Sequence, residues 1–176
     1  LFEFSDRQAT LASTVQRVAN SLAEAAKGGD VPEDPKMVQQ VARQAVHRAA
    51  VAKDTVPILW VDDHPSNNAA IVAALRDLRI SVDLALSTAE GLDRLARGTY
   101  SLAITDMGRT ENGTFVPDAG EQFLVKARAQ HPDLPVLVFT SAGGLKRSQE
   151  LRAKGAGLVT ASASELFGEA VRLVTQ

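Results

Sequence analysis

Hydrophobic residues follow two different patterns in the two parts of this chain. In the first part they are spaced three and four positions apart, which is the period of an amphipathic helix. One stripe consists of Leu11, Val15, Val18 and Leu22, and a second of Val38, Val41, Ala45 and Ala49. Beyond about residue 56, short apolar runs alternate with amphipathic stretches, which is typical of strands followed by helices. The pattern therefore predicts two helices and then an α/β domain.

The sequence contains signals for the start and the end of each predicted helix. Ser5 or Asp6 is expected to cap the first helix, and the glycine pair 28–29 is expected to end it. Asp34 is the expected N-cap of the second helix, with Pro35 in its first turn, where proline is best tolerated. The sequence therefore predicts a helical hairpin.

The two parts of the chain are predicted to meet at Asp54–Pro57. This divides the chain into a hairpin or connector over residues 1–54 and a domain over residues 55–176. Two short helices bury little apolar surface alone, so the hairpin needs a neighbour. Two arrangements remain open: the hairpin packs on the following domain, or it forms a homodimer through these N-terminal helices.

The second part is predicted to alternate strands and helices five times. The expected strands lie near 58–61, 81–86, 100–105, 135–139 and 157–160. The expected helices lie near 66–79, 88–97, 118–130, 144–154 and 164–174. Such alternation implies a parallel sheet with right-handed crossovers and helices on both faces.

Acidic residues stand at the ends of two of these predicted strands. Asp62 and Asp63 end the run 58–61, and Asp106 ends the run 101–105. If the two strands are parallel neighbours, the three carboxylates converge at the carboxyl edge of the sheet, where α/β proteins place their ligand sites. Crowded carboxylates favour a hard cation such as Mg²⁺. We expect a Mg²⁺ pocket with Asp106 as a phosphoryl acceptor; simple polar caps at the strand ends are the alternative.

Composition narrows the classes of function. A net charge of −2 and a pI near 5.9 give no electrostatic reason to expect a nucleic-acid partner. The chain has no cysteine, which excludes disulfides and thiolate chemistry and fits a cytoplasmic location. No apolar stretch approaches the roughly 20 residues of a membrane span, so no membrane contact is expected from this chain. Because it begins at Leu1 rather than Met, we interpret it as a fragment.

From about Val56 onward, the chain resembles the receiver domains of bacterial two-component response regulators. The matching residues, in family order, are Val61-Asp62-Asp63, Asp106, Asp118-Ala119-Gly120, Val138-Phe139-Thr140-Ser141 and Gly155-Ala156. The resemblance implies a flavodoxin-like, doubly wound, five-stranded parallel sheet in the order 2-1-3-4-5.

The resemblance also implies a role for each residue of the acidic site. Asp106 would accept a phosphoryl group from a histidine kinase or a phosphotransfer protein. Asp62, Asp63, Asp106 and the carbonyl of Gly108 would hold Mg²⁺. The Thr140 hydroxyl would bind the phosphoryl group and draw its loop inward.

Three features depart from the receiver pattern. The family carries Lys-Pro after its last strand, whereas this chain has Ala161 and Ser162 there. Leu158 replaces the family's aromatic residue. The stretch Gly108–Pro117 is longer than the usual loop and lacks its proline, and it is predicted to be flexible.

Three nearby cations could replace the missing lysine, namely Arg109, Lys146 and Arg147. We interpret them as solvated surface charges, and keep compensation by Arg109 as a hypothesis. His47 is interpreted as a surface histidine rather than a phosphohistidine, and Trp60 as part of the core.

Two functions follow from these observations. The first is an atypical receiver in phosphorelay signal transduction, and the alternative is a pseudo-receiver, an interaction domain that phosphorylation does not control. Neither is an enzyme in the ordinary sense. A Mg²⁺-dependent phosphohydrolase is rejected, because it needs an Asp-x-Asp pair after the first strand and this chain has adjacent aspartates.

Overall fold

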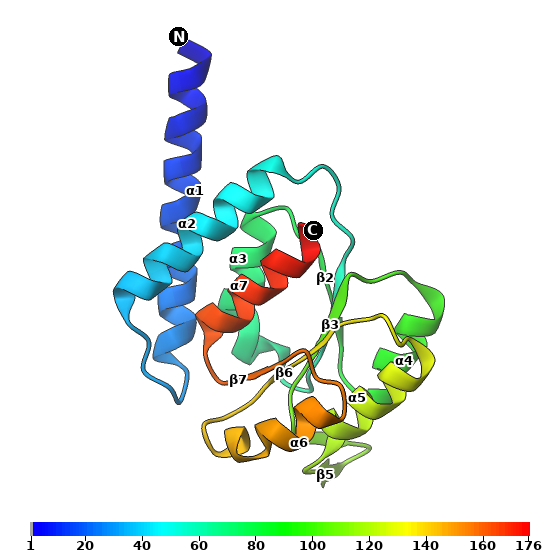
Figure 1. Ribbon diagram of the computed structural model, residues 1–176. Coiled ribbons are helices and arrows are strands. Elements are labelled where there is room, and N and C mark those ends of the chain that lie inside the picture. The colour runs from blue at the N-terminus through cyan, green and yellow to red at the C-terminus, as the bar shows by residue number, and fades with distance from the viewer. Residues whose placement is uncertain (1) are drawn as a thin grey trace.

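A five-stranded parallel sheet lies at the centre of the computed structural model, which describes residues 2–176 (Figure 1). Its strands are β1 (Ile58–Val61), β2 (Val82–Ala85), β3 (Leu102–Thr105), β6 (Val136–Phe139) and β7 (Leu158–Thr160). Their order is β2-β1-β3-β6-β7. Counting only these strands, this is the predicted flavodoxin-like order 2-1-3-4-5, which is confirmed.

Helices cover both faces of the sheet (Figure 1). One face carries α3 (Ala69–Asp77) and α7 (Ala163–Val174), and the other carries α4 (Thr88–Arg97), α5 (Ala119–Gln130) and α6 (Ser148–Ala153). Alternate residues of β1 point to opposite faces, so Trp60 joins the core under α3 and α7 while Leu59 joins the core under α4 and α5. This two-sided burial explains why β1 is apolar throughout.

Two of the predicted helices begin as short 3₁₀ segments instead. The helix expected at 66–79 starts with η1 (Pro65–Asn68) and continues as α3, which ends at Asp77. The helix expected at 144–154 starts with η2 (Gly143–Arg147). In both cases the helix begins with proline, asparagine or glycine, which are weak formers of α-helix.

Two further helices, α1 (Phe2–Lys27) and α2 (Pro35–Val51), form the predicted hairpin. Asp34 caps α2 by accepting a hydrogen bond from the Lys36 N–H. The expectation that Ser5 or Asp6 caps α1 is wrong, because the helix already begins at Phe2. The N-terminal part of α1 projects beyond the rest of the molecule (Figure 1). None of the helices within residues 2–176 is long and apolar enough to cross a membrane.

The hairpin packs on the helices of the α/β part, as one of the two interpretations predicted. Helix α1 lies against α2 and α3, and α2 lies against α7. The side chains of Val18, Leu22, Val38 and Ala45 are buried in the same core as Trp60. The α1–α2 loop is also held to α7, since the Glu33 carboxylate accepts hydrogen bonds from the Ser162 hydroxyl at 2.7 Å and the Ser164 N–H at 3.1 Å. An acidic group at a helix N-terminus is favourable there.

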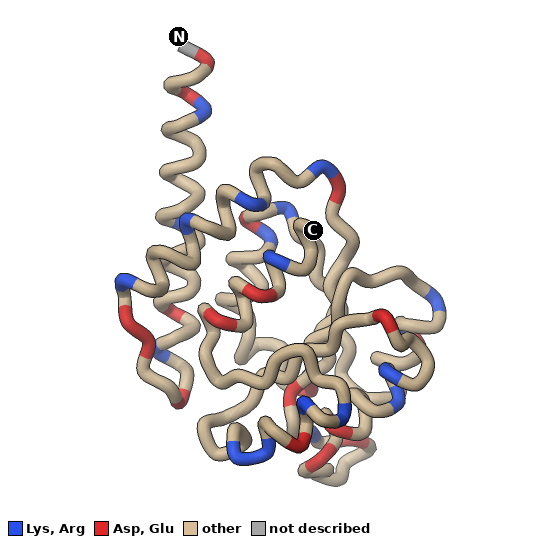
Figure 2. Tube along the Cα trace, in the orientation of Figure 1, with Lys and Arg blue, Asp and Glu red and all other residues tan. Residues whose placement is uncertain are grey.

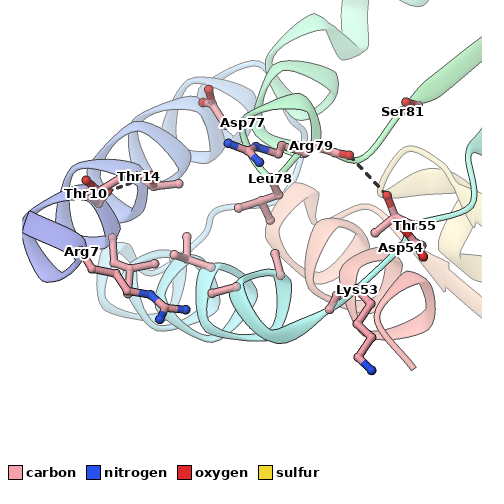
Figure 3. Close-up of a pocket in the computed structure, with 15 residues that line it drawn as sticks. Arg7, Thr10, Thr14, Lys53, Asp54, Thr55, Asp77, Leu78, Arg79 and Ser81 are labelled. Carbon is pink, nitrogen blue, oxygen red and sulfur yellow. Dashed lines mark hydrogen bonds between the residues drawn. The ribbon is translucent and has the colours of Figure 1, made fainter. Parts of the chain in front are cut away.

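A cavity lies between the hairpin and the end of α3, beside the residues that precede β2. It has a volume of about 700 Å³, and α1, the end of α2 and the end of α3 line it (Figure 3). Its lining includes Arg7, Asp77 and Arg79. The residues predicted to carry chemistry are not among those that line this cavity.

Candidate acidic site at the carboxyl edge of the sheet

Strands β1 and β3 bring the predicted aspartates to one edge. The two strands are parallel neighbours, with Val61 opposite Thr105. The Asp106 N–H donates a hydrogen bond to the Val61 carbonyl at 3.3 Å. The prediction that these two runs are adjacent parallel strands is therefore confirmed, and the residues that follow them share the carboxyl edge.

Asp62 is buried and both of its carboxylate oxygens are hydrogen-bonded. Oδ1 accepts from the His64 N–H at 2.7 Å, and Oδ2 accepts from the Asn68 side-chain amide at 2.7 Å. Asn68 is itself buried at the end of η1. These contacts fix the orientation of the Asp62 carboxylate.

Asp63 binds the segment that follows β3. Its Oδ2 accepts a hydrogen bond from the Thr110 N–H at 2.9 Å and lies 3.1 Å from the His64 Nδ1. Partial burial acts to raise the pKa of Asp63, but the hydrogen bonds from Thr110 and His64 outweigh burial and lower that pKa. One ligand atom each from Asp62, Asp63 and His64 lies within 4.8 Å of the others. This group includes His64, which the sequence analysis did not predict, and does not include Asp106.

Asp106 lies beside this group, and its carboxylate pairs with a cation. Its Oδ1 accepts a hydrogen bond from the Arg109 Nη1 at 2.5 Å. Burial raises the pKa of Asp106 to about 7, with the like charges of Asp62 and Asp63 acting in the same direction and Arg109 against them. The charges of both other aspartates therefore act on the pKa of Asp106, although its carboxylate is hydrogen-bonded to Arg109.

The interpretation of Arg109 as a solvated surface charge is wrong. Its side chain is 0% exposed. Besides Asp106, its guanidinium donates to four oxygen atoms: Thr105 Oγ1 at 2.8 Å, Thr88 Oγ1 at 2.7 Å, the Ala119 carbonyl at 3.1 Å and Glu111 Oε1 at 3.1 Å. Arginine rarely enters a protein interior unless it is paired, and these acceptors are the reason it does so here.

The stretch predicted to be a flexible loop is an ordered β-hairpin. Strands β4 (Arg109–Glu111) and β5 (Thr114–Val116) pair antiparallel through a two-residue turn. Both turn residues have positive φ, 51° at Asn112 and 78° at Gly113, as in a type I′ turn. Asn-Gly is the strongest short signal for this turn, so the sequence contained the information that the flexible-loop prediction overlooked.

Two glycines allow the backbone to approach closely around Asp106. A Cβ atom on Gly120, at the start of α5, would lie 1.8 Å from the Asp106 carbonyl oxygen. A Cβ atom on Gly108 would lie 2.7 Å from the ring of Phe115, which is 64% exposed on β5. The hairpin thus covers Gly108 with an aromatic ring, and the close approach of α5 requires glycine at position 120.

Thr140 follows β6 at the same edge and is half-buried. Its N–H donates to the Thr160 carbonyl at 2.9 Å. Its Oγ1 lies 1.9 Å from the position that a Cβ on Gly144 would occupy, so η2 folds closely over it. The Ala142 N–H of this loop donates to Asp30 of the α1–α2 loop at 3.3 Å.

The position where the resemblance expects a lysine has structural roles instead. Ala161 is buried, and the Ser162 hydroxyl caps α7 by accepting from the Glu165 N–H at 3.1 Å. Lys146 is exposed, as predicted. Arg147 pairs at the surface with Glu121 and Glu150, which also fits its prediction as a surface charge.

The two remaining predictions about single side chains are confirmed. His47 is exposed on α2. Trp60 is 1% exposed and packs edge-on against Phe139, with ring centroids 6.4 Å apart. Figure 2 shows that acidic and basic positions gather where α5, α6 and the β4–β5 hairpin lie.

The chain matches no protein-family model and no curated protein. It does resemble solved structures. With the receiver domain of NtrX from Brucella abortus it shares 22% identity over 66% of this chain and 97% of that chain, with a TM-score of 0.58. With chemotaxis response regulator CheY4 of Vibrio cholerae it shares 22% identity over 69% and 99%, with a TM-score of 0.55.

A third similar structure is the response regulator protein TrrA from Thermotoga maritima in complex with Mg(2+)-BeF. It is 21% identical over 67% of this chain and 98% of that chain, with a TM-score of 0.55. At these identities the likeness concerns the fold. Over about two thirds of its length, the chain therefore has the fold of the response-regulator receiver domains.

Proposed function

We propose that this chain is an atypical receiver module in phosphorelay signal transduction, with Asp106 as its phosphoacceptor. The observation that carries the proposal is the position of Asp106. It follows the central strand of a receiver fold and lies beside Asp62 and Asp63 from the adjacent strand. A receiver is a regulatory domain that accepts a phosphoryl group on its own side chain, so turnover of a separate substrate is not part of the proposal.

The chemistry of the acidic edge fits Mg²⁺. The carboxylates of Asp62, Asp63 and Asp106 and the carbonyl of Gly108 are hard oxygen donors, which suit this ion. Burial is the main cause of the raised pKa of Asp106, and the charges of Asp62 and Asp63 add to it, so a divalent cation at this edge would favour the ionised carboxylate. When bound, the ion supplies charge neutralisation at the carboxylates and at the incoming phosphoryl oxygens.

Phosphoryl transfer to Asp106 forms one bond to phosphorus and breaks another. A carboxylate oxygen of Asp106 attacks phosphorus, and the bond between phosphorus and the donor breaks. With a histidine kinase or phosphotransfer protein as donor, this is a P–N bond, and the imidazole leaves with the bonding electron pair. The product is an acyl phosphate on Asp106. Thr140 would donate its hydroxyl to the phosphoryl group, a role supported by its place at the same edge.

The pseudo-receiver is the second candidate, and one observation favours it. Ala161 and Ser162 occupy the position where the resemblance expects a lysine, and both have other contacts. An interaction domain of this kind would bind Mg²⁺ at the acidic edge without taking up phosphate.

Labelling with a small phosphodonor tests the two candidates against each other. Acetyl phosphate and Mg²⁺ should add one phosphoryl group to the wild type, seen in the intact mass, and none to Asp106→Asn. The fluorescence of Trp60, which lies two residues before Asp62, should be used to measure Mg²⁺ binding. Mg²⁺ binding without any label would support the pseudo-receiver and contradict phosphoacceptance at Asp106.

A homodimer through the N-terminal helices stays a prediction. Packing on α3 and α7 already buries Val18 and Leu22, which leaves the projecting part of α1 for such a contact. Phe4 there is 70% exposed. Sedimentation of the wild type and of Phe4→Glu would test it, since a dimer through this surface should dissociate in the variant. A cytoplasmic location and the absence of nucleic-acid and membrane partners also stay predictions.

A further inference from the structure

Every hydrogen-bond donor of the buried Arg109 guanidinium has an acceptor. An arginine offers five N–H donors in a fixed planar fork. Nη1 donates to Asp106 and Thr105, Nη2 to Thr88 and to a main-chain carbonyl, and Nε to Glu111. Five donors meet five acceptors, so the group is held in one orientation with its charge against the Asp106 carboxylate.

These acceptors come from several separate elements. They belong to the end of β3, the first residue of α4, the start of α5 and the strand β4 itself. The set is further linked because the Thr88 N–H donates to Glu111 Oε1 at 2.6 Å. A side chain fixed from so many directions loses little conformational entropy when it binds a ligand.

Phosphorylation would increase the negative charge beside this fixed cation. A carboxylate carries one negative charge, whereas an aspartyl phosphate carries up to two on its terminal oxygens at neutral pH. Arginine binds phosphoryl oxygens through charge-assisted hydrogen bonds, and more strongly in a site with little water. The Nη1 donor that now bonds Asp106 lies beside the carboxylate that would carry those oxygens.

Two of the surface cations nearby have other partners, and a third, Lys146, is exposed. Arg147 and Lys154 both pair with Glu121 and Glu150 on α5 and α6. Residues 161 and 162, after β7, are alanine and serine. We infer that Arg109, supplied by the hairpin after β3, is the catalytic cation that binds the phosphoryl group on Asp106, in place of a lysine after the last strand. This inference rests on the proposed function.

The test compares binding of Mg²⁺ alone with binding of BeF₃⁻, a phosphoryl mimic, in the presence of Mg²⁺. The variants are Arg109→Met and Arg109→Lys, with Arg147→Met as the matched control from the exposed cluster. Loss of one charge-assisted hydrogen bond corresponds to roughly 10- to 100-fold in affinity. Arg109→Met should weaken BeF₃⁻ binding and slow acetyl phosphate labelling by that factor, while Mg²⁺ alone binds equally well or more tightly because a positive charge is gone.

Each outcome of this test has one meaning. Arg109→Lys should recover part of the BeF₃⁻ affinity, and Arg147→Met should match the wild type. A structural role alone would weaken Mg²⁺ and BeF₃⁻ binding together, which would overturn the inference. Equal labelling of Arg109→Met and wild type would also overturn it while leaving Asp106 as the phosphoacceptor. A wild type that neither labels nor binds BeF₃⁻ would refute the proposed function itself.

A measurement on the wild type covers the case in which the Arg109 variants do not fold. In ¹⁵N-labelled protein, the guanidinium N–H signals of Arg109 should shift when BeF₃⁻ is added to the Mg²⁺-bound protein. The signals of Arg147 should stay in place. Arg109 signals that do not respond to BeF₃⁻ would overturn the inference.

Discussion

Two clusters of charged side chains lie near the acidic edge, and they differ mainly in burial. In the first, the fully buried Arg109 contacts Asp106 and Glu111, whose side chains are 19% and 17% exposed. In the second, Arg147 and Lys154 pair with Glu121 and Glu150 at the surface, with side chains that are 15–48% exposed. Both clusters join several elements, but only the first has a cation that is fully buried.

The clusters shift the pKa of their carboxyl groups differently. Burial raises the pKa of Asp106 to about 7 even though Arg109 touches it. In the exposed cluster, the hydrogen bond from Lys154 lowers the pKa of Glu121 and outweighs the opposing effect of burial. Glu111 is partly buried, and burial raises its pKa, but the hydrogen bonds from Thr88 and Arg109 lower that pKa overall. An ion pair thus stabilises the ionised form only where hydrogen bonds exceed the cost of desolvation.

The largest expected effect is that of removing the buried arginine. Arg109→Ala should lower the free energy of unfolding by about 3–5 kcal/mol, because it leaves Asp106 and Glu111 without their cation in a buried site. Urea unfolding followed by circular dichroism measures this loss. Arg147→Ala is the control, with an expected loss of at most about 1 kcal/mol. Equal losses in the two variants would refute the comparison.

The pH dependence of stability should differ in sign between the clusters. Unfolded Asp106 releases its proton near its ordinary pKa of 3.8, and folded Asp106 near 7. Between these values the folded state holds a proton that the unfolded state lacks, so the contribution of Asp106 to stability is lost as pH rises from about 4 to 7. The loss is at most about 4 kcal/mol. Glu121, whose pKa is lowered, should instead lose its contribution as pH falls below its ordinary value of 4.5.

Urea titrations at several pH values would measure this effect. EDTA is added to chelate divalent ions. The stability of Asp106→Asn relative to wild type should rise between pH 4 and pH 7 and then level off, since asparagine does not titrate. A difference that stays constant across this range would show that Asp106 titrates normally in the folded protein.

The sequence predicted the sheet well because its signals are local. The apolar runs give the strands, and aspartates at two strand ends give the acidic edge. Arg109 was misjudged because its burial depends on acceptors distant in the chain, such as Thr88 and the Ala119 carbonyl. His64 is a different case, because it directly follows Asp63 and its Nδ1 contacts that carboxylate through the local conformation of the turn after β1. Pairing across elements is a property of the folded chain, and a single sequence does not show it.

An added side-chain atom should destabilise the backbone around the buried cluster more than the backbone near the exposed cluster. Gly120→Ala would place a Cβ 1.8 Å from the Asp106 carbonyl oxygen, so α5 or the end of β3 must move. We expect a loss of about 1–3 kcal/mol in the free energy of unfolding and weaker Mg²⁺ binding. Gly143→Ala is the control, because its nearest contact would be the Ser141 hydroxyl at 3.7 Å. Full stability of Gly120→Ala would show that the approach of α5 is looser than described.

The smallest expected effect comes from the exposed cluster itself. Glu121→Gln removes the carboxylate that both Arg147 and Lys154 contact, but water can replace it on each cation. The free energy of unfolding should fall by less than about 1 kcal/mol, and the difference should shrink further at 1 M salt, where surface charges are screened. Arg109→Ala should keep most of its effect at the same salt concentration, because its partners are shielded from ions. Urea unfolding at low and high salt measures both. If salt reduced the two losses by the same fraction, burial would not be what separates these clusters.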